Sequence, residues 1–327
     1  MVGASIYKNG IIMKLYLVVF AVGLTLAWRA ASHWPLPIWW LENLTSFQFF
    51  PLLLWLVVLC CILPWQRFCY SRTLFQHAVK PAWKLPAICL VFLVEALVNI
   101  LPTQIVSDTA LCHTKVNILQ ANWAYHFNAQ RDVETLLASQ ADLIVLQEVS
   151  QASMAKLKNK ITQDYPFSAN LHANGQFLLS KTPLFSAQRL NQFLTTATWQ
   201  LPNTQPVTLF TMHPPSPRSA SLWHTRNTAF ERLQAESDKA LFAEQLVVGD
   251  FNLASTTGRY KKLSQGWHHL PVVTWPEFGL LKYWGVAIDH LWVSGSLKVV
   301  TRASQALFDS DHRAVMSSVC IDGTIAL

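Results

Sequence analysis

The residues best suited to chemistry are polar side chains that stand at the ends of apolar, strand-like stretches. They are Asn122, Glu148, His213, Asp250, Asn252, Asp289, Asp311 and His312. A buried strand has no need of such groups, because removing an unpaired carboxylate from water is costly. We therefore expect several strand ends to meet at one rim and to bring these side chains into a single site.

This combination of acids, asparagines and histidines predicts a particular chemistry. Carboxylate and amide oxygens bind hard divalent cations, and a histidine beside an aspartate can transfer protons. Structural zinc is not expected, because no pair of cysteines lies near the histidines. Taken alone, each residue has a simpler explanation: Asn122 or Asp311 could form a turn, Glu148 could be a solvated charge, and His213 could be an ordinary loop residue. The argument for a site depends on the whole set.

In order along the chain, these residues resemble the motifs of the endonuclease/exonuclease/phosphatase (DNase I-like) superfamily. The matching segments are Val-Asn-Ile-Leu-Gln-Ala-Asn-Trp ending at Trp123, Leu146-Gln147-Glu148, His213, Gly249-Asp250-Phe251-Asn252, Ile288-Asp289-His290 and Ser310-Asp311-His312. The resemblance covers residues 115–319. One motif is weak, whereas six in order are specific.

The resemblance implies how a metal ion and a phosphate would be held. Glu148 would bind Mg²⁺, or alternatively Mn²⁺, and Asn122 and Asp311 would position the ion or its waters. Asn252, together with Asn122, would contact a phosphate oxygen. Nucleases of the family often carry an acid two residues after the first asparagine, and Ala124 at that position favours a site with one metal ion.

The resemblance also implies the catalytic roles. Asp250 would orient or deprotonate the attacking water. His312 would stabilise the pentacovalent phosphate, with Asp289 holding its ring. His213 would be a second phosphate ligand or the acid that protonates the leaving group. A metal ion and an imidazole would together neutralise the charge that develops in the transition state.

The elements that must position these groups form a mixed α/β pattern. Strands are expected at 115–122, 142–149, 176–180, 193–201, 206–212, 245–249, 287–293 and 314–321, and helices at 129–140, around 154–161 and at 220–244. They interleave without strict βαβ alternation or a Gly-rich phosphate loop, which predicts a sheet-rich sandwich. With the resemblance, we expect a DNase I-like four-layer α/β sandwich as the catalytic domain, residues 105–327.

Residues 1–104 are expected to form a membrane anchor. Apolar stretches at 11–28, 47–63 and 85–101 approach the ~20 residues that a bilayer requires, which predicts three transmembrane helices. A cleaved signal peptide is an alternative for the first stretch, and a buried core helix is an alternative for any one of them. Two further apolar stretches argue against the signal peptide.

The positive charge of the chain belongs mainly to this apolar region. Residues 1–102 carry a net charge of +5 out of the total of +7, which leaves +2 for the rest. Placing the N-terminus inside puts six basic side chains on the cytoplasmic side and two outside, as the positive-inside rule requires. We therefore expect a multi-pass protein of the cytoplasmic (inner) membrane whose catalytic domain is extracytoplasmic, and the resemblance implies a bacterial-type member of the superfamily.

Cys112 and Cys320 are the two cysteines of the expected catalytic domain. They could be two free buried thiols. In the family's fold, however, the first and last strands are antiparallel neighbours, so the resemblance implies that the two cysteines can face each other. A disulfide between them would agree with an oxidising, extracytoplasmic compartment.

The combined prediction is a Mg²⁺-dependent phosphoesterase tethered to a lipid bilayer, which hydrolyses a phosphomonoester, phosphodiester or pyrophosphate. A lipid-linked phosphate is the favoured substrate. The first alternative is an extracytoplasmic endonuclease or exonuclease on DNA or RNA, although the +2 charge of the domain is small for binding a polyanion. The second is a catalytically inactive membrane scaffold, suggested by Glu95 in the third apolar stretch. No protein partner is predicted.

Overall fold

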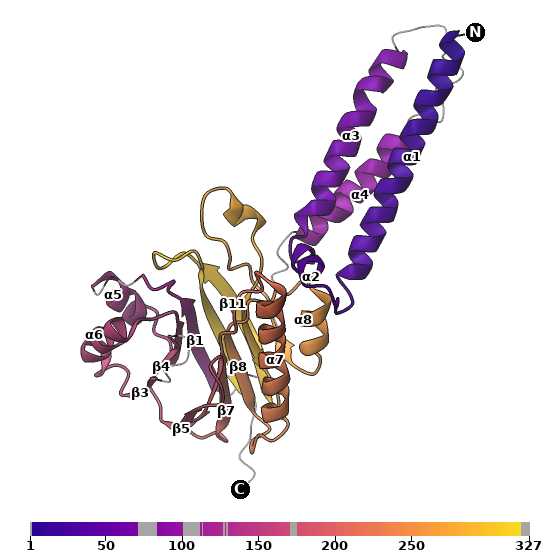
Figure 1. Ribbon diagram of the computed structural model, residues 1–327. Helices are drawn as coiled ribbons and strands as arrows, with labels where there is room; N and C mark the ends of the chain where they lie inside the picture. Colours follow the sequence, from indigo (N-terminus) through magenta and orange to yellow (C-terminus); the bar gives the residue numbers. More distant parts are fainter. Residues whose placement is uncertain are drawn as a thin grey trace.

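Two different architectures follow each other along the chain: a long helical bundle and an α/β sandwich (Figure 1). The computed structural model describes residues 2–70, 84–100, 112, 114–126, 128, 130–170 and 175–321. The N-terminus lies at the end of the bundle that is far from the sandwich.

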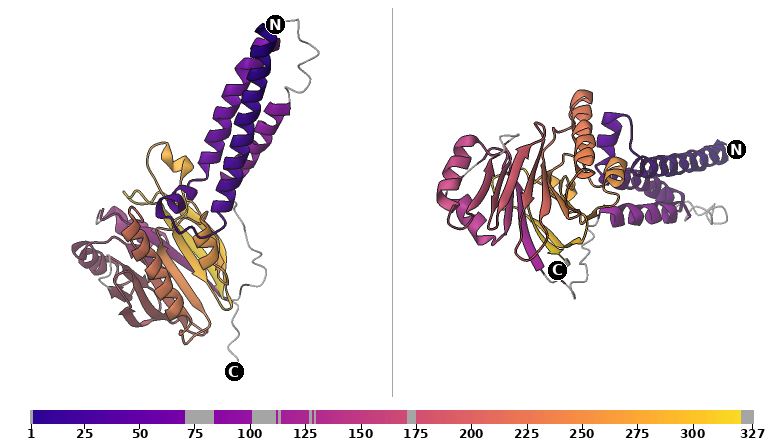
Figure 2. Two further views of the ribbon diagram at one scale, coloured as in Figure 1. Left: turned by 45° about the vertical axis from the view of Figure 1, so that its right-hand side comes forward. Right: turned by 90° about the horizontal axis from the view of Figure 1, so that it is seen from below.

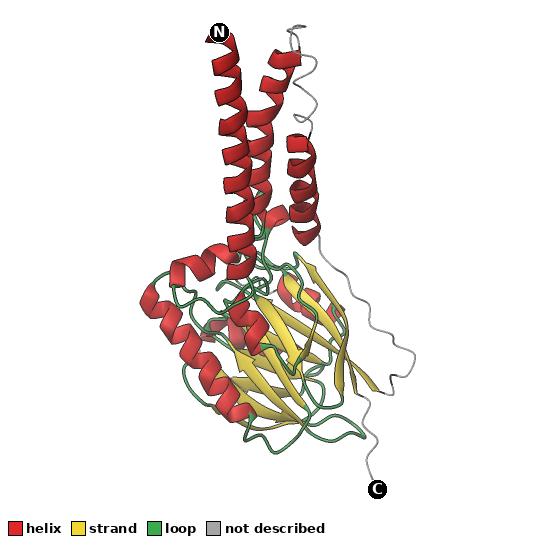
Figure 3. Ribbon diagram, turned by 90° about the vertical axis from the view of Figure 1, so that its right-hand side faces the viewer, coloured by secondary structure: helices red, strands yellow, loops and turns green. Residues whose placement is uncertain are grey.

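The bundle contains the helices of the N-terminal third. They are α1 (Val2–Ala31), the short α2 (Trp39–Thr45), α3 (Phe49–Tyr70) and α4 (Lys84–Ile100). The long helices α1, α3 and α4 lie side by side (Figure 3). Trp55 of α3 is fully buried between them and stacks on Phe92 of α4 with ring centroids 4.7 Å apart. Much of the outer surface of the bundle is also apolar, with Tyr16, Phe20 and Val91 exposed.

The prediction of three transmembrane helices is met by one helix alone. Among the described residues, Ile12–Ala31 is a helix of 20 residues that is long and apolar enough to cross a membrane. The second stretch passes the same test only when α2 and Phe49–Leu63 are taken together, and these are bent by 73°. The third forms α4, whose 17 residues span about 25 Å, less than the ~30 Å of a hydrocarbon core.

The sandwich is built from two mixed sheets of six strands. The first has the order β11-β12-β1-β2-β4-β3 and the second the order β5-β6-β7-β8-β10-β9. In the first sheet the strands are β1 (Thr114–Asn122), β2 (Leu143–Gln147), β3 (Phe167–Asn170), β4 (Phe177–Ser180), β11 (Leu297–Gln305) and β12 (Ala314–Ile321). In the second they are β5 (Leu184–Arg189), β6 (Leu194–Trp199), β7 (Val207–Met212), β8 (Gln245–Asp250), β9 (His268–His269) and β10 (Asp289–Val293).

Helices cover the outer face of each sheet, which confirms the predicted four layers (Figure 2). Helices α5 (Arg131–Ala138) and α6 (Gln151–Ile161) pack on the first sheet through residues such as Leu136 and Leu157. Helices α7 (Ala220–Ser237) and α8 (Gly258–Leu263) pack on the second. A third core, of aliphatic side chains and Trp199, fills the space between the sheets. Burial of apolar surface on both faces of each sheet therefore holds the strand ends in place.

The ends of the sandwich domain are joined covalently. Strand β1 pairs with β12 in antiparallel register, with Lys115 opposite Cys320. Cys112 and Cys320 form a disulfide with their Cα atoms 5.5 Å apart. The structure thus contains the expected disulfide, at the end of β1 away from Asn122.

The bundle and the sandwich are in direct contact through the segment that includes α2. Asn43 donates to the carbonyl of Pro217 at 2.7 Å, and Thr256 donates to the carbonyl of Ser46 at 3.0 Å. A Cβ atom on Gly258 would lie 2.3 Å from the backbone of Trp34, so only glycine fits there. The N-terminal third is therefore packed on the sandwich, and these contacts fix the orientation of the sandwich relative to the bundle.

Candidate active site

Four strands deliver polar side chains to one edge of the sandwich. Asn122 is the last residue of β1, Glu148 follows β2, Asp250 ends β8 and Asp289 begins β10. Asp289 and Asp250 are register partners across the antiparallel pair β10–β8. The convergence of strand ends that the sequence predicts is therefore present.

Unusual backbone geometry occurs where these strands end. Glu148 and Asn252 have φ angles of 53° and 47°, a region that residues other than glycine occupy at some cost. Gly249 has a φ of 149°, and a Cβ atom there would lie 2.0 Å from the carbonyl oxygen of Met212. The glycine is thus required for β8 to lie against β7 just before Asp250.

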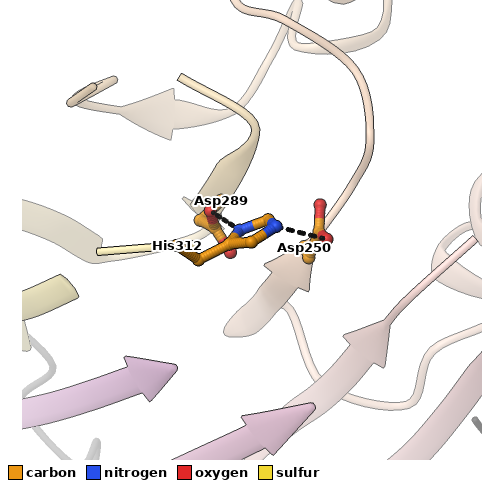
Figure 4. Close-up of side chains that lie close together, drawn as sticks. All are labelled: Asp250, Asp289 and His312. Carbon is orange, nitrogen blue, oxygen red and sulfur yellow. Dashed lines mark hydrogen bonds and ion pairs between the residues drawn. The ribbon is translucent and has the colours of Figure 1, made fainter. Parts of the chain in front are cut away.

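The centre of the site is a line of three buried residues, Asp289, His312 and Asp250 (Figure 4). His312 Nδ1 lies 2.9 Å from Asp289 Oδ2, and His312 Nε2 lies 3.8 Å from Asp250 Oδ2. Gln120 donates to the other oxygen of Asp289 at 2.7 Å. The ring of His312 therefore has a fixed orientation, with one nitrogen held by an acid and the other directed at a second acid.

The charges of these residues reinforce one another. Burial alone would lower the pKa of His312, but Asp289 and Asp250 raise it to about 10. Burial raises the pKa of Asp250 to about 6, against the opposing effect of His312. Burial also acts to raise the pKa of Asp289, but the charge and hydrogen bond of His312 hold it below its usual range. At neutral pH the site thus contains a cationic imidazole between two carboxylates, one of which binds protons near neutrality.

Glu148, Asn122 and His213 extend this line toward the surface. The amide nitrogen of Asn122 donates to Glu148 Oε1 and to Asp250 Oδ2, at 3.2 Å in both cases. His213 Nε2 lies 3.4 Å from Glu148 Oε1 and 3.7 Å from Asp250 Oδ2. Burial acts to raise the pKa of Glu148, but His213 and Asn122 hold it below the usual value. Glu148 is therefore a carboxylate at neutral pH, and it is only partly buried.

Asn252 is held beside Asp250 by several contacts. Its backbone N–H donates to Asp250 Oδ1 at 2.8 Å, and its side-chain nitrogen donates to the carbonyl of Pro214 at 3.0 Å. Arg226 of α7 donates to the carbonyl of Asn252 at 3.0 Å and also pairs with Glu42 of α2. Glu42 thus links the N-terminal bundle to the wall of the site.

Asp311 was expected to help position the metal ion or its waters. It is exposed, and its Oδ2 accepts a hydrogen bond from Trp275 Nε1 at 3.0 Å. Its charge still contributes to the raised pKa of His312. The structure therefore places Asp311 at the mouth of the site, while Asn122, Glu148, His213, Asp250, Asn252, Asp289 and His312 are joined by the contacts described above.

Two groups of donors could hold a divalent cation. Asp250, Asp289 and His312 each offer a ligand atom within 4.8 Å of the others. Both nitrogens of His312, however, already face carboxylates, which suits proton transfer better than coordination. Glu148 and Asn122 form the second group, with the ionised, half-buried carboxylate of Glu148 facing the site. Such oxygen donors fit Mg²⁺, which needs few carboxylates because it keeps several waters.

Some residues of the site were not expected from the sequence. Gln120 and Thr274 both hold Asp289, through its side chain and its backbone N–H respectively. Gln120 is a buried polar residue two positions before Asn122 on β1, so alternation along the strand was a usable signal. His290, in contrast, points away to the carbonyl of Leu253 and has a structural role.

Comparisons with known proteins give a family match and a set of similar folds. The model of the Endonuclease/Exonuclease/phosphatase family matches residues 122–312, which include all the site residues named above except Gln120 and Glu42. A search of curated proteins found no match.

Solved structures are similar in fold at low sequence identity. The endonuclease/exonuclease/phosphatase from Bacteroides vulgatus has a TM-score of 0.54 and 13% identity, covering 64% of this chain and 99% of that chain. The endonuclease/exonuclease/phosphatase from Beutenbergia cavernae DSM 12333 has a TM-score of 0.53 and 16% identity, covering 64% and 72%. TDP2 from D. rerio, complexed with single strand DNA product, has a TM-score of 0.50 and 16% identity, covering 63% and 99%.

Proposed function

Because this chain belongs to the endonuclease/exonuclease/phosphatase family, whose members are hydrolases of phosphate esters, we propose that it is a Mg²⁺-dependent phosphoesterase held at a membrane by its N-terminal helices. The observation that carries this proposal is the line Asp289–His312–Asp250, with Glu148 beside it. These residues bring together a cation that can bind phosphate (His312), a proton acceptor (Asp250) and a carboxylate that can bind a metal ion (Glu148).

The residues divide the work of hydrolysis between them. Asp250 accepts the proton of the attacking water, since its pKa of about 6 suits a base at neutral pH. His312, kept cationic and oriented by Asp289, donates to a phosphate oxygen and stabilises the added negative charge. Asn252 contributes an amide donor to the phosphate, and His213 protonates the leaving oxygen.

Glu148 and Asn122 would hold the metal ion, and Asp311 at the mouth would hold its waters. When bound, the ion supplies a Lewis acid that polarises the phosphate and neutralises its charge. The amide of Asn122, which touches both Glu148 and Asp250, keeps the metal-binding and proton-accepting carboxylates at a fixed separation.

The membrane part of the proposal is supported by the surface of the bundle. Leu15, Val19, Leu53, Val57 and Val94 are exposed on α1, α3 and α4, and such a surface is unfavourable in water. We propose that α1 crosses the membrane and that α3 and α4 pack against it through the core of the bundle. The disulfide agrees with a catalytic domain on the extracytoplasmic side.

The alternatives have less support. Glu95, which suggested a scaffold, forms an ion pair with Arg29 at 2.8 Å and so has a structural role. A nuclease uses the same site chemistry, and the small charge of the domain is the reason for placing it second.

The direct test is a comparison of substrates with the purified full-length protein and Mg²⁺. Plasmid DNA, RNA, sphingomyelin, an inositol phosphate, a polyprenyl pyrophosphate and bis(p-nitrophenyl) phosphate would be offered side by side, with Asp250→Asn as the control. Hydrolysis that requires Mg²⁺ and Asp250 is expected for a lipid-borne ester. Cleavage of DNA or RNA alone would favour the nuclease, and an inactive wild-type protein would refute the proposal.

A further inference from the structure

A short segment at the rim of the site has an unusually apolar surface. Residues 276–285 connect β9 to β10 and include the 3-10 helix η2 (Leu281–Trp284). Leu280 is 78% exposed and Tyr283 69%, and Phe278 and Trp284 follow with 49% and 38%. Four large apolar side chains within seven residues of surface loop mark a contact surface rather than an ordinary loop.

This segment, which we call the rim loop, stands beside the helical bundle (Figure 1) and contacts the start of α3. It projects from the same end of the sandwich as α1, α3 and α4 (Figures 1 and 2). Trp284 packs edge-on against Phe49, the first residue of α3, with ring centroids 5.8 Å apart. On the chain segment between α1 and α3, Trp34 and Trp40 are also exposed. The rim loop therefore touches the bundle at the start of α3, and exposed apolar side chains are present on both.

The rim loop is also fastened to the catalytic centre. Glu277 N–H donates to the carbonyl of Asp311 at 2.7 Å, and the Glu277 carboxylate lies 3.2 Å from Arg313. Trp275, just before the loop, donates to the side chain of Asp311 at 3.0 Å. The residues on both sides of His312 are thus bonded to one end of the loop.

We propose that the rim loop enters the interfacial region of the bilayer beside the bundle and holds the mouth of the site against the membrane, so that the enzyme acts on a phosphate ester carried by a lipid. Tryptophan and tyrosine favour this region because each combines an apolar ring with a polar group. Lys282, whose ammonium lies 5.4 Å from the centre of the Tyr283 ring, adds a positive charge suited to lipid phosphates. This inference names the substrate class of the proposed phosphoesterase and rests on that function.

The activity test compares two esters with the same leaving group. Full-length protein in phosphatidylcholine vesicles would be given soluble bis(p-nitrophenyl) phosphate or a dioleoylglycerol p-nitrophenyl phosphodiester placed in the vesicle. The double variant Leu280→Ser/Tyr283→Ser should lose about tenfold or more on the lipid ester and keep its rate on the soluble ester, because only membrane contact is weakened. The matched control is Leu241→Ser, which changes a side chain that is 92% exposed between α7 and β8.

An equal loss on both esters would overturn the inference, because the loop would then only support the site. A wild-type enzyme that cleaves the soluble ester and not the lipid ester would also overturn it, while leaving the phosphoesterase proposal intact.

A second measurement does not depend on activity. Benzoylphenylalanine placed at Tyr283 should form a lipid adduct on illumination in the same vesicles, detected by mass spectrometry, and the same residue placed at Leu241 should not. Absence of the adduct at Tyr283 would refute membrane contact by the rim loop whatever the enzyme proves to hydrolyse.

Discussion

Glu42 of α2 and Arg226 of α7 form a buried ion pair that joins the N-terminal bundle to the catalytic sandwich. Both side chains are 2% exposed, and Glu42 also receives Arg259 at 2.7 Å and the indole N–H of Trp223 at 3.0 Å. Since Arg226 also donates to the carbonyl of Asn252, a residue of the anchor region helps to shape the active site.

We expect Glu42→Ala to destabilise the protein by about 3–5 kcal/mol, because two arginines lose their buried partner. It should also lower kcat more than it raises KM, since Asn252 would lose its support. Thermal unfolding and steady-state kinetics on bis(p-nitrophenyl) phosphate would measure both effects. Glu236→Ala, which removes surface ion pairs to Arg232 and Lys239, is the control and should change stability by less than about 1 kcal/mol. Equal behaviour of the two variants would show that the buried pair is dispensable.

Asp250→Asn should reduce kcat by about 10²–10⁴-fold, because the amide cannot accept the proton of the attacking water. The substitution keeps the size of the side chain, so the unfolding temperature should not fall. Steady-state kinetics and circular dichroism would measure the two properties. Retention of most of the activity by a folded Asp250→Asn protein would assign the base to another group.

Removal of divalent cations with EDTA should abolish hydrolysis, and added Mg²⁺ or Mn²⁺ should restore it. Glu148→Gln should require a higher Mg²⁺ concentration for half-maximal activity, since the charged oxygen ligand is lost. Titration calorimetry with Mg²⁺ and activity titrations would report the shift. A wild-type enzyme that remains active in EDTA would contradict a metal-dependent mechanism.

The pH dependence of kcat/KM should be bell-shaped. Asp250 acts as a carboxylate with a pKa of about 6, so activity should rise as the pH increases through about 6. His312 acts as a cation with a pKa of about 10, so activity should fall as the pH approaches 10. Asp289→Asn should move the alkaline limb to lower pH, because Asp289 is the main group that raises the pKa of His312. If the alkaline limb stayed at the same pH in Asp289→Asn, the positive charge of His312 would not be required for activity.

Reduction of the disulfide should lower the stability of the sandwich. Cys112 and Cys320 are separated by 208 residues. A disulfide that closes such a long loop reduces the conformational entropy of the unfolded chain, which raises the free energy of unfolding by up to about 5 kcal/mol. In the absence of dithiothreitol, Cys112→Ser should therefore unfold at a lower temperature than the wild type. Adding dithiothreitol should lower the unfolding temperature of the wild type to that of the variant. If dithiothreitol left the wild-type unfolding temperature unchanged, the bond would make no contribution.

The catalytic core could be predicted largely from the sequence because its signals are local. Buried strands such as β2 and β8 are continuous apolar runs that end in a polar residue, and both were placed within a few positions. Strand β5 was missed because it is an exposed edge strand with no apolar pattern, and the nine-residue β11 was missed because a bulge at Val299–Thr301 interrupts its alternation. The helix expected to reach residue 244 ends at Ser237.

Contacts between distant parts of the chain could not be predicted in the same way. Glu42 and Arg226 are 184 residues apart, and no motif around either residue indicates that they form an ion pair. The three apolar stretches predicted helices correctly, but nothing in the sequence indicated the 73° bend between α2 and Phe49–Leu63. Asp311 was expected from its place before the last strand and from its motif, but nothing in the sequence indicated its hydrogen bond to Trp275.

The disulfide turns the catalytic domain into a closed ring, and every candidate catalytic residue from Asn122 to His312 lies within it. A protease that cuts one exposed loop of the ring would leave two fragments covalently linked, and both would stay attached to the anchor through Cys112. The disulfide cannot form until Cys320 has been synthesised. Strand β12 must therefore be complete before the disulfide can stabilise the domain.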